Sequence, residues 1–185
     1  MRFTLATTLF LAIISRSFGQ LDPLYSQYHF NQYVINPAYA GMYENMSFTL
    51  NSRAQWFGLE GSPITNTFTA ISNIGNSAGV GVRLMNDRIG IRIANELVVS
   101  GSYFIKSHLT TLGFGLQGGI TQVGNNLRKL DPEVLDDPVL DGFIPQYSFP
   151  NFGVGVVIQR FDYFIGLSIP RILSQDEPDP TFEDN

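Results

Sequence analysis

The chain of 185 residues has no cysteine, only two histidines and few basic residues. Without cysteine there is no disulfide framework, no thiolate metal site and no cysteine nucleophile. His29 and His108 alone leave little from which to build a zinc or haem centre. The 11 basic residues are outnumbered by 16 acidic ones, which argues against nucleic acid as a partner. We therefore expect no cofactor, no metal and no nucleic-acid partner.

Charge of either sign is also scarce. Charged residues make up 15% of the chain, whereas an average soluble domain has about 25%. The composition is rich instead in glycine and aromatic residues, with 18 Gly, 15 Phe and 8 Tyr. Few charges with many glycines and aromatics are typical of an all-β chain, including one that resides in a membrane.

Residues 1–19 have the three parts of a secretory signal peptide. Arg2 supplies the positive start, residues 5–14 form an apolar run, and Ser17 and Gly19 are the small residues of a cleavage site. The apolar run is too short for a membrane-spanning helix, which needs roughly 20 residues. We expect cleavage before Gln20 and export to a Gram-negative periplasm or outer membrane.

From residue 47 onward, apolar and polar residues alternate with a period of two, and glycine or proline separates the runs. This pattern predicts antiparallel strands joined by turns. In the clearest run Leu97 and Val99 share one face, and Glu96 and Ser100 share the other. The expected strands cover residues 47–57, 64–73, 78–87, 91–106, 111–124, 154–160 and 163–169.

Two architectures fit this alternation, a transmembrane β-barrel and a soluble β-sandwich. The barrel is favoured because the less apolar face carries small and polar residues, which suits a wet or plugged lumen. Strand lengths of about ten residues also fit a tilted membrane crossing. Aromatic residues near the strand ends fit an interfacial girdle; they are Trp56, Phe57, Phe104, Phe161 and Tyr163. Charges expected in the lumen, pairing across strands to hold a plug or lining a pore, are Arg53, Arg83, Arg92, Glu96 and Lys106.

Three segments lie outside the alternating runs. Residues 20–46 are rich in tyrosine and amides, which argues against disorder and predicts a plug in the lumen or a periplasmic segment. Residues 129–149, between strands of a barrel region spanning residues 47–173, form an acidic loop. Its five carboxylates between Asp131 and Asp141 suit a solvated loop, with calcium binding as the alternative. Residues 174–185 are an acidic tail.

No sequence pattern of the chain matches a catalytic motif in the context that the motif requires. Gly113, Gly115 and Gly118 form a G-x-G-x-x-G sequence, but the alternation continues through it without the helix that a dinucleotide site requires. The chain has neither a G-x-S-x-G nor an H-E-x-x-H motif. We therefore expect a protein that is not an enzyme.

Four groups of residues form an ordered set of short motifs along the chain. They are Gln27, Tyr28, Phe30 and Asn31; Asn36, Pro37, Ala38 and Gly41; Arg53, Gln55 and Trp56, in an R-x-Q-W pattern; and Gly61, Pro63 and Thr65, in a G-x-P-x-T pattern. Together these motifs resemble the PorP/SprF family of the type IX secretion and gliding system.

The resemblance implies an outer-membrane accessory protein that docks or retains secreted cargo, such as an adhesin, at the cell surface. Its implied partners are type IX components, the C-terminal signal domain of the cargo, and outer-membrane lipid. A small-molecule channel and a soluble exported β-sandwich that binds a ligand remain the alternatives.

The chain departs from the family in two ways. His29 and Gln32 stand where many members have Met and Pro. Family barrels also have about twice as many strands as the seven counted here, and an open barrel leaves edges that lipid does not tolerate. We therefore expect an incomplete, N-terminal portion of a barrel, or completion by another chain or by an unrecognised eighth strand.

Overall fold

The computed structural model describes residues 29–43, 46–125 and 146–173. The predicted signal peptide, the acidic tail and most of the acidic loop therefore lie outside the described residues. Those described form two short 3-10 helices and seven strands. The elements are η1 (Gln32–Val34), η2 (Pro37–Tyr39), β1 (Ser47–Ala54), β2 (Ile64–Ile74), β3 (Ala78–Ile89), β4 (Arg92–Lys106), β5 (Thr110–Asn125), β6 (Gln146–Arg160) and β7 (Phe164–Ile169).

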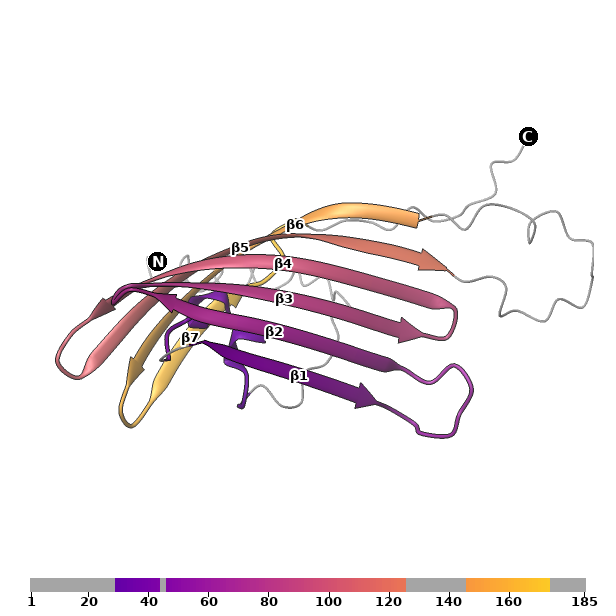
Figure 1. Ribbon diagram of the computed structural model, residues 1–185, viewed down its shortest axis with the longest axis horizontal. Coiled ribbons are helices and arrows are strands. Elements are labelled where there is room, and N and C mark those ends of the chain that lie inside the picture. The colour runs from indigo at the N-terminus through magenta and orange to yellow at the C-terminus, as the bar shows by residue number, and fades with distance from the viewer. Residues whose placement is uncertain (1–28, 44–45, 126–145, 174–185) are drawn as a thin grey trace, which may run out of the picture.

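The strands form one sheet in chain order, β1 to β7, and every neighbouring pair is antiparallel. The sheet curls into an open half-barrel with the N-terminal helices beneath its arch (Figure 1). The predicted all-β, antiparallel, barrel-type fold is confirmed. A β-sandwich needs two packed sheets, so that alternative is wrong for the residues that the structure describes.

The two ends of the sheet differ in their connections. At the short-turn end, three residues join each hairpin: 75–77 between β2 and β3, 107–109 between β4 and β5, and 161–163 between β6 and β7. At the opposite, long-loop end, residues 55–63 join β1 to β2, and the sequence between β5 and β6 covers residues 126–145. Gly90, with a φ of 59°, makes the tight β3–β4 turn at this same end.

Alternate residues of each strand face opposite sides of the sheet, as strand geometry requires. On β4, Glu96, Val98 and Ser100 are buried on the concave inner face, whereas Leu97 and Val99 are exposed on the convex outer face. The G-x-G-x-x-G residues lie within β5, so they are part of the wall. The assignment of polar and small residues to the inner face therefore agrees with the structure.

Three details differ from the sequence predictions. β1 ends at Ala54 and not at residue 57, because the chain turns at Trp56, which has a φ of 52°. β6 begins at Gln146, well before Val154 and inside the range predicted for the acidic loop. Phe104 does not join an outer aromatic girdle: it shares the parity of Ser100 and packs on the inner face at 2% exposure.

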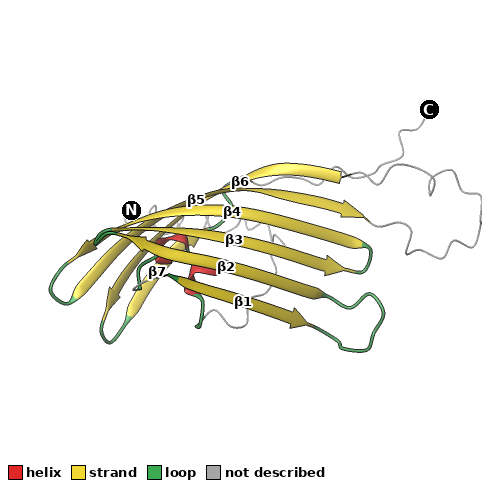
Figure 2. Ribbon diagram, viewed as in Figure 1, coloured by secondary structure: helices red, strands yellow, loops and turns green. Residues whose placement is uncertain are grey.

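Residues 31–43, here called the plug, run across the inner face of the sheet. Both 3-10 helices lie under the arch of the sheet (Figure 2), where η2 contacts β4, β5 and β6 and η1 bonds to β3 and β4. Asn36 caps η2, since its side-chain oxygen accepts a hydrogen bond from the Ala38 backbone N–H, and Pro37 occupies the first helical position. This local sequence makes a compact double turn that fits within the curvature of the sheet.

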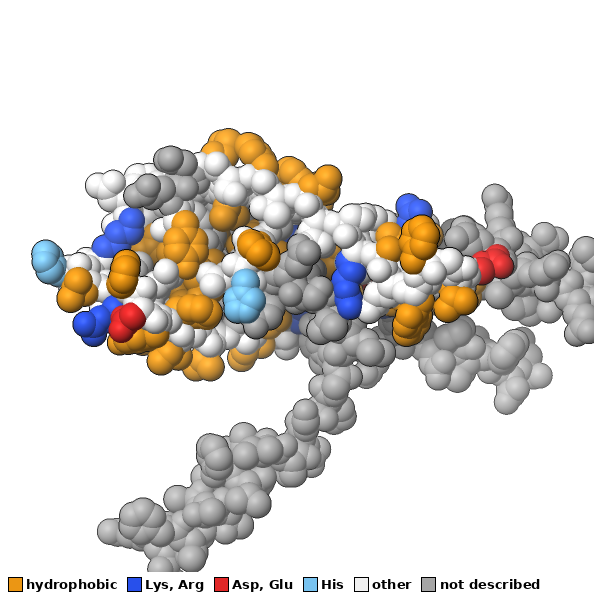
Figure 3. All heavy atoms as spheres, turned by 90° about the horizontal axis from the view of Figure 1, so that it is seen from below, with side chains coloured by type: hydrophobic (Ala, Val, Ile, Leu, Met, Phe, Trp, Pro, Cys, Tyr) orange, Lys and Arg blue, Asp and Glu red, His pale blue; other side chains and the backbone are white. Residues whose placement is uncertain are grey.

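Many large apolar side chains of the described residues are exposed. Seen from below, hydrophobic side chains extend along the molecule and charged side chains are few (Figure 3). Among the described residues, no helix is long and apolar enough to cross a membrane.

Candidate functional site: a plug seated in the lumen

The seat of the plug is a row of small residues that crosses five strands. Cross-strand register places Gly79, Ser102, Gly115, Gly155 and Ser168 side by side on β3 to β7. All five share the inner face, because register preserves the parity of side chains across a sheet. Their small size leaves room for the plug on the inner face, in the half of the wall near the short turns.

The plug packs so closely against this row that larger side chains in the wall would not fit. A Cβ atom on Gly115 would overlap the backbone of Pro37 and Ala38, and one on Gly155 would overlap the Asn36 side chain. The neighbouring Gly81 gives room to the Tyr33 ring, which would lie 2.6 Å from an added Cβ. The inner-face glycines therefore shape the surface against which the plug packs.

Hydrogen bonds tie the plug to five strands, β2, β3, β4, β6 and β7. The Tyr33 hydroxyl lies 2.9 Å from the Ser100 hydroxyl on β4, and the Ser102 hydroxyl donates to the Ala40 carbonyl. Asn36 donates from its amide nitrogen to backbone carbonyl oxygens on β6 and β7, at 3.2 and 3.4 Å. Asn31 donates to the Thr69 hydroxyl on β2 at 2.7 Å.

The apolar side of the plug forms the main core of the molecule. Plug residues pack against Phe104 of β4 and Val157 of β6, with Ile71 at the margin. Tyr39 is 3% exposed, its hydroxyl has no hydrogen-bond partner among the described residues, and burial raises its pKa to about 12. The Tyr39 and Tyr43 rings stack with centroids 6.1 Å apart. The core members from the plug are Tyr33, Ala38, Tyr39, Ala40 and Met42.

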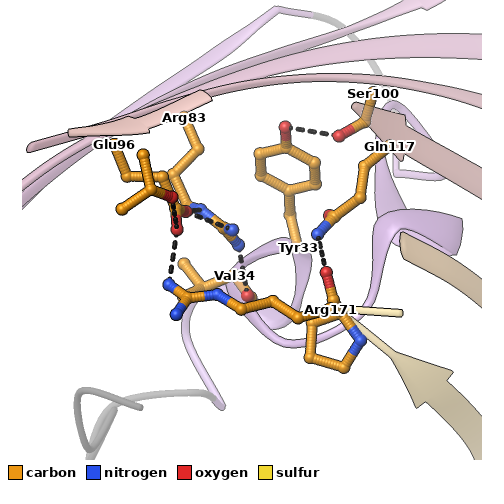
Figure 4. A network of polar contacts seen from close by, with 9 residues as sticks. Tyr33, Val34, Arg83, Glu96, Ser100, Gln117 and Arg171 are labelled. Atoms are coloured by element: carbon orange, nitrogen blue, oxygen red, sulfur yellow. Dashed lines mark hydrogen bonds and ion pairs between the residues drawn. The ribbon is translucent and has the colours of Figure 1, made fainter. Parts of the chain in front are cut away.

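A buried ion network lies beside this core (Figure 4). Arg83 on β3 pairs with Glu96 on β4 at 2.7 Å, with both side chains no more than 5% exposed. The second Glu96 carboxylate oxygen pairs with Arg171 at 2.6 Å. Arg83 also donates to the Val34 carbonyl at 2.6 Å, so the network links the wall directly to the plug. Buried charges require such partners because their desolvation is costly.

Residues 170–172, here called the strap, cross the inner face after β7. The Pro170 carbonyl accepts a hydrogen bond from Gln117 on β5 at 2.8 Å (Figure 4). The Ile172 N–H donates to the Phe152 carbonyl at 2.8 Å. Gly153 makes room for this crossing, since a Cβ there would overlap the Pro170 carbonyl. The strap and the plug therefore meet at one ion network from opposite ends of the described chain.

The predicted N-terminal motif residues fall mostly within the plug. Gln27 and Tyr28 lie outside the described residues, and Phe30 is 88% exposed. Buried in the plug are Asn36, Pro37, Ala38 and Gly41; Asn31 is half-buried. Gly41, with a φ of 67°, passes against the backbone of β2, where a Cβ would overlap the Ser72 carbonyl. The structure gives this motif a packing role.

The motif residues of the first hairpin lie at the long-loop end. Arg53 and Gln55 lie at the end of β1 on the inner side, and Trp56 is 70% exposed in the turn. Gly61 accepts a hydrogen bond from the Gly90 N–H at 2.9 Å, and Thr65 donates to Asp87 at 2.6 Å. These contacts connect the β1–β2 and β3–β4 turns but do not reach the plug.

The predicted lumen charges do not form one group. Arg83 and Glu96 meet, whereas Arg92 lies at the long-loop end of β4 and Lys106 is exposed at its short-turn end. Sequence reasoning missed Arg171 as the second partner of Glu96, as well as Tyr33 and Gln117. One sequence pattern could have predicted the seat of the plug. Gly-x-Gly occurs in β3, β5 and β6, beginning at Gly79, Gly113 and Gly153.

The site is suited to holding a segment in place. Among the described ranges, no three His, Asp or Glu side chains gather where they could hold a metal ion. The polar atoms of the network are directed at one another and at the plug backbone, as Figure 4 shows. The arrangement anchors two chain segments to the wall.

Comparison with known families gives one match. Residues 17–184 match the family described as type IX secretion system membrane protein PorP/SprF. A search of curated proteins and a search of solved structures gave no match to this chain. The family match covers most of the sequence, including the plug, the seven strands and the strap.

Proposed function

The chain belongs to the PorP/SprF family of type IX secretion system membrane proteins, and on that premise we propose that it is a non-catalytic accessory component in the outer membrane. Its role there is to dock or retain secreted cargo at the cell surface. The partners are other type IX components and the C-terminal signal domain of the cargo. Export by a cleaved signal peptide at residues 1–19 belongs to this proposal.

The seated plug is the observation that carries the proposal. Residues 31–43 are bonded to the wall through Tyr33, Val34 and Asn36, and the small-residue row matches their shape. A channel for small molecules requires an open, water-filled lumen. A wall built around its own N-terminal segment favours a scaffold that anchors and presents loops.

The short-turn and long-loop ends suggest how such a scaffold is used. In outer-membrane barrels, short turns face the periplasm and longer loops face outward. The β1–β2 connection therefore belongs to the surface at which cargo is retained. Function on loops held by a rigid scaffold is a common arrangement, because loops tolerate variation that a packed wall does not.

Gene deletion in the organism that encodes the chain tests this role. We expect cargo that carries the type IX C-terminal signal to be lost from the cell surface and restored by the wild-type chain. Fractionation of the complemented strain should place the chain in the outer membrane. Unchanged surface cargo in the deletion strain would contradict the docking role.

Conductance in planar bilayers tests the channel alternative. The purified chain should conduct poorly while its plug is seated. A variant of the seat, Gly115→Val, should conduct more, and Gly101→Val should conduct like the wild type because an added Cβ on Gly101 meets no atom within 4 Å. High conductance of the wild-type chain would favour the channel.

A further inference from the structure

The outer face of the sheet carries a continuous row of polar side chains. Cross-strand register aligns one on each strand from β1 to β6, and all of them are exposed or half-buried. None of these side chains is charged. We call these residues the polar row. Its members are Ser52, Asn66, Asn86, Asn95, Gln122 and Ser148.

Apolar side chains lie on both sides of the polar row. Toward the short-turn end, the next outer row includes Leu84, Leu97 and Ile120, which are 43–49% exposed. Toward the long-loop end, the next outer position is Arg88 on β3 but is apolar on β1, β2 and β4. These apolar residues are Ala54, Ile64 and Ile93. The polar row therefore interrupts an apolar surface and does not mark where that surface ends.

The tilt of barrel strands spreads the polar row over several depths of a membrane. At a strand spacing of about 4.8 Å, the row from β1 to β6 is roughly 24 Å long. It runs perpendicular to the strands, so a strand tilt of about 40° makes its depth change by roughly 15 Å from end to end. The headgroup region of one leaflet is only about 5–8 Å thick. Because apolar residues continue beyond the row on β1, β2 and β4, part of the row lies within the hydrocarbon layer.

The centre of the row keeps hydrogen-bonding groups that the wall does not use. Asn86 donates from its amide nitrogen to the Asn95 amide oxygen at 2.7 Å. This bond leaves the Asn86 oxygen as an acceptor and the Asn95 nitrogen as a donor, and neither has another partner among the described residues. Lipid tails cannot supply one. In membrane proteins, Asn and Gln side chains satisfy such groups by hydrogen bonding across protein contacts.

The unused groups of one Asn86–Asn95 pair complement those of a second copy. A two-fold axis along the membrane normal keeps both copies in the same membrane orientation and makes the contact the same from either side. The Asn95 nitrogen of each copy can then donate to the Asn86 oxygen of the other, which closes a ring of four amides. An asparagine pair within an otherwise apolar contact fixes the partner and the register of coiled coils in the same way.

The shape of the outer face favours the same pairing. The sheet curls across its strands, so its outer face is convex in that direction (Figure 1). A hollow of about 560 Å³ nevertheless lies over the row, and its lining includes Asn86, Asn95, Leu84 and Leu97, so the face is concave along the strands. In the two-fold arrangement, strands that each tilt by about 40° cross at about 80°. The convex direction of each copy then lies along the concave direction of the other.

We propose that the polar row joins two copies of this chain through their outer faces, with the two Asn86–Asn95 pairs at the two-fold axis. Leu84 and Leu97 then pack around the four amides and exclude lipid from them. The inference rests on the outer-membrane location proposed above. It adds a partner and a contact surface, which family membership does not supply. The plug lies on the opposite face of the sheet, so each copy keeps its own plug and seat.

Cysteine cross-linking tests the contact directly, because the chain has no cysteine of its own. Two differently tagged forms of the full chain, Asn86→Cys and Asn95→Cys, would be reconstituted together in phospholipid vesicles and oxidised. We expect a disulfide-linked dimer that carries both tags. The control Val99→Cys shares the outer face of β4 but lies roughly 13 Å along the strand from Asn95, beyond the reach of a disulfide across the axis. Cross-linking of the mixed pair no greater than that of Val99→Cys would overturn the proposed contact.

Replacement of the central amides tests whether they hold the dimer together. A double variant with Asn86→Leu and Asn95→Leu makes the outer face more apolar and should remain folded, which protection of the plug from protease would verify. Its association constant in vesicles, measured by single-molecule photobleaching, should fall about tenfold because the inter-copy amide bonds are lost. The control Ser148→Leu makes a similar change at the end of the row and should leave the association constant unchanged. A double variant that dimerises as strongly as the wild type would refute the role of the amides.

The outcomes separate this inference from the proposed location. A chain that leaves cell membranes without detergent would refute the outer-membrane location itself. A wild-type chain that is membrane-inserted but monomeric would keep the location and refute the dimer. In whole cells, a photoreactive amino acid at position 95 should give an adduct of twice the mass of the chain. An adduct of another mass alone would assign the row to a different membrane protein and overturn the second copy.

Discussion

On β5, Gly115 and Leu116 are neighbours in the chain but lie on opposite faces of one sheet, and their surroundings are opposite in kind. Gly115 is buried beneath the plug, where even a methyl group would overlap the backbone of Pro37 and Ala38. Leu116 is 67% exposed on the outer face. The inner face must match the shape of a particular segment, whereas the outer face has only to be apolar.

The same contrast holds for charge. Glu96 is buried on the inner face and bonded to two arginines, whereas the outward-facing residues of β4 from Leu97 to Ile105 carry no charge. The wall can therefore hold buried charges where groups of the plug and the strap supply their hydrogen-bond and ion-pair partners. Each prediction below compares a substitution in the plug or its seat with a matched control, in order of decreasing expected effect.

Removal of the Glu96 charge should give the largest loss. Glu96→Gln leaves Arg83 buried without its carboxylate, and breaking a buried pair in this way costs about 3–5 kcal/mol. The control Asp162→Asn alters a carboxylate that is 67% exposed in its contact with Arg160 and should cost less than about 1 kcal/mol. The measurement is the free energy of unfolding in urea, for chain purified in detergent. Equal losses for the two variants would show that the network does not stabilise the fold.

Glycine substitutions compare the two faces most directly. Gly115→Ala should cost about 1–3 kcal/mol, because the plug must shift to accommodate the methyl group. Gly101→Ala on the outer face meets no atom within 4 Å and should leave stability unchanged or raise it by a few tenths of a kcal/mol. Protease cleavage of the plug gives a second readout, and Gly115→Ala alone should accelerate it. Similar unfolding and cleavage for both variants would contradict the fitted seat.

Loss of the Asn36 side chain should have an intermediate effect. Asn36→Ala removes the cap of η2 and the two bonds to carbonyls on β6 and β7, which should cost about 1–2 kcal/mol. Asn31→Ala removes one half-buried bond to Thr69 and should cost about 0.5–1 kcal/mol. Urea unfolding followed by circular dichroism measures both variants. A larger loss for Asn31→Ala would reverse the assigned importance of the two asparagines.

The sequence was sufficient to predict the wall and its faces. Period-two alternation along β4 and β5 identifies the side of each residue, because strand geometry enforces it. Strand ends were less predictable: Gln146 to Phe149 alternate over only four residues before Pro150, a residue that argues against a central strand, and pairing with β5 brings them into the sheet. Phe104 shows the same limit. An aromatic residue near a strand end suits an interfacial girdle, but its position on β4 turns it to the inner face, where it packs against the plug.

The plug seat required the structure. Arg171 meets Glu96 from 75 residues away, and nothing local in the sequence indicates that pair. Gln117 likewise donates to the Pro170 carbonyl because the strap crosses the inner face, which the sequence does not indicate. Long-range polar contacts depend on register and curvature, which set distances that alternation alone does not specify.

Two buried tyrosines give the smallest predicted effects and the finest test of the seat. Tyr33→Phe removes a hydroxyl bonded to Ser100 and should cost about 0.5–1.5 kcal/mol. Tyr39→Phe removes a buried hydroxyl without a partner among the described residues and should leave stability at pH 7 unchanged or slightly higher. Urea unfolding compares the two variants, and a greater loss for Tyr39→Phe would place a partner on that hydroxyl.

Stability at alkaline pH tests the burial of the Tyr39 phenol directly. Burial raises its pKa to about 12 in the folded chain, whereas an unfolded tyrosine ionises near pH 10. Between those values the unfolded state releases a proton that the folded state retains, so stability is lost as pH rises from about 10 to about 12. Tyr39→Phe should lose less stability than the wild type over this interval, and absorbance at 295 nm should show one late-titrating phenol fewer. An unchanged alkaline loss in Tyr39→Phe would mean that this phenol is not buried between the plug and the wall, and the close fit of the plug would then end short of Tyr39.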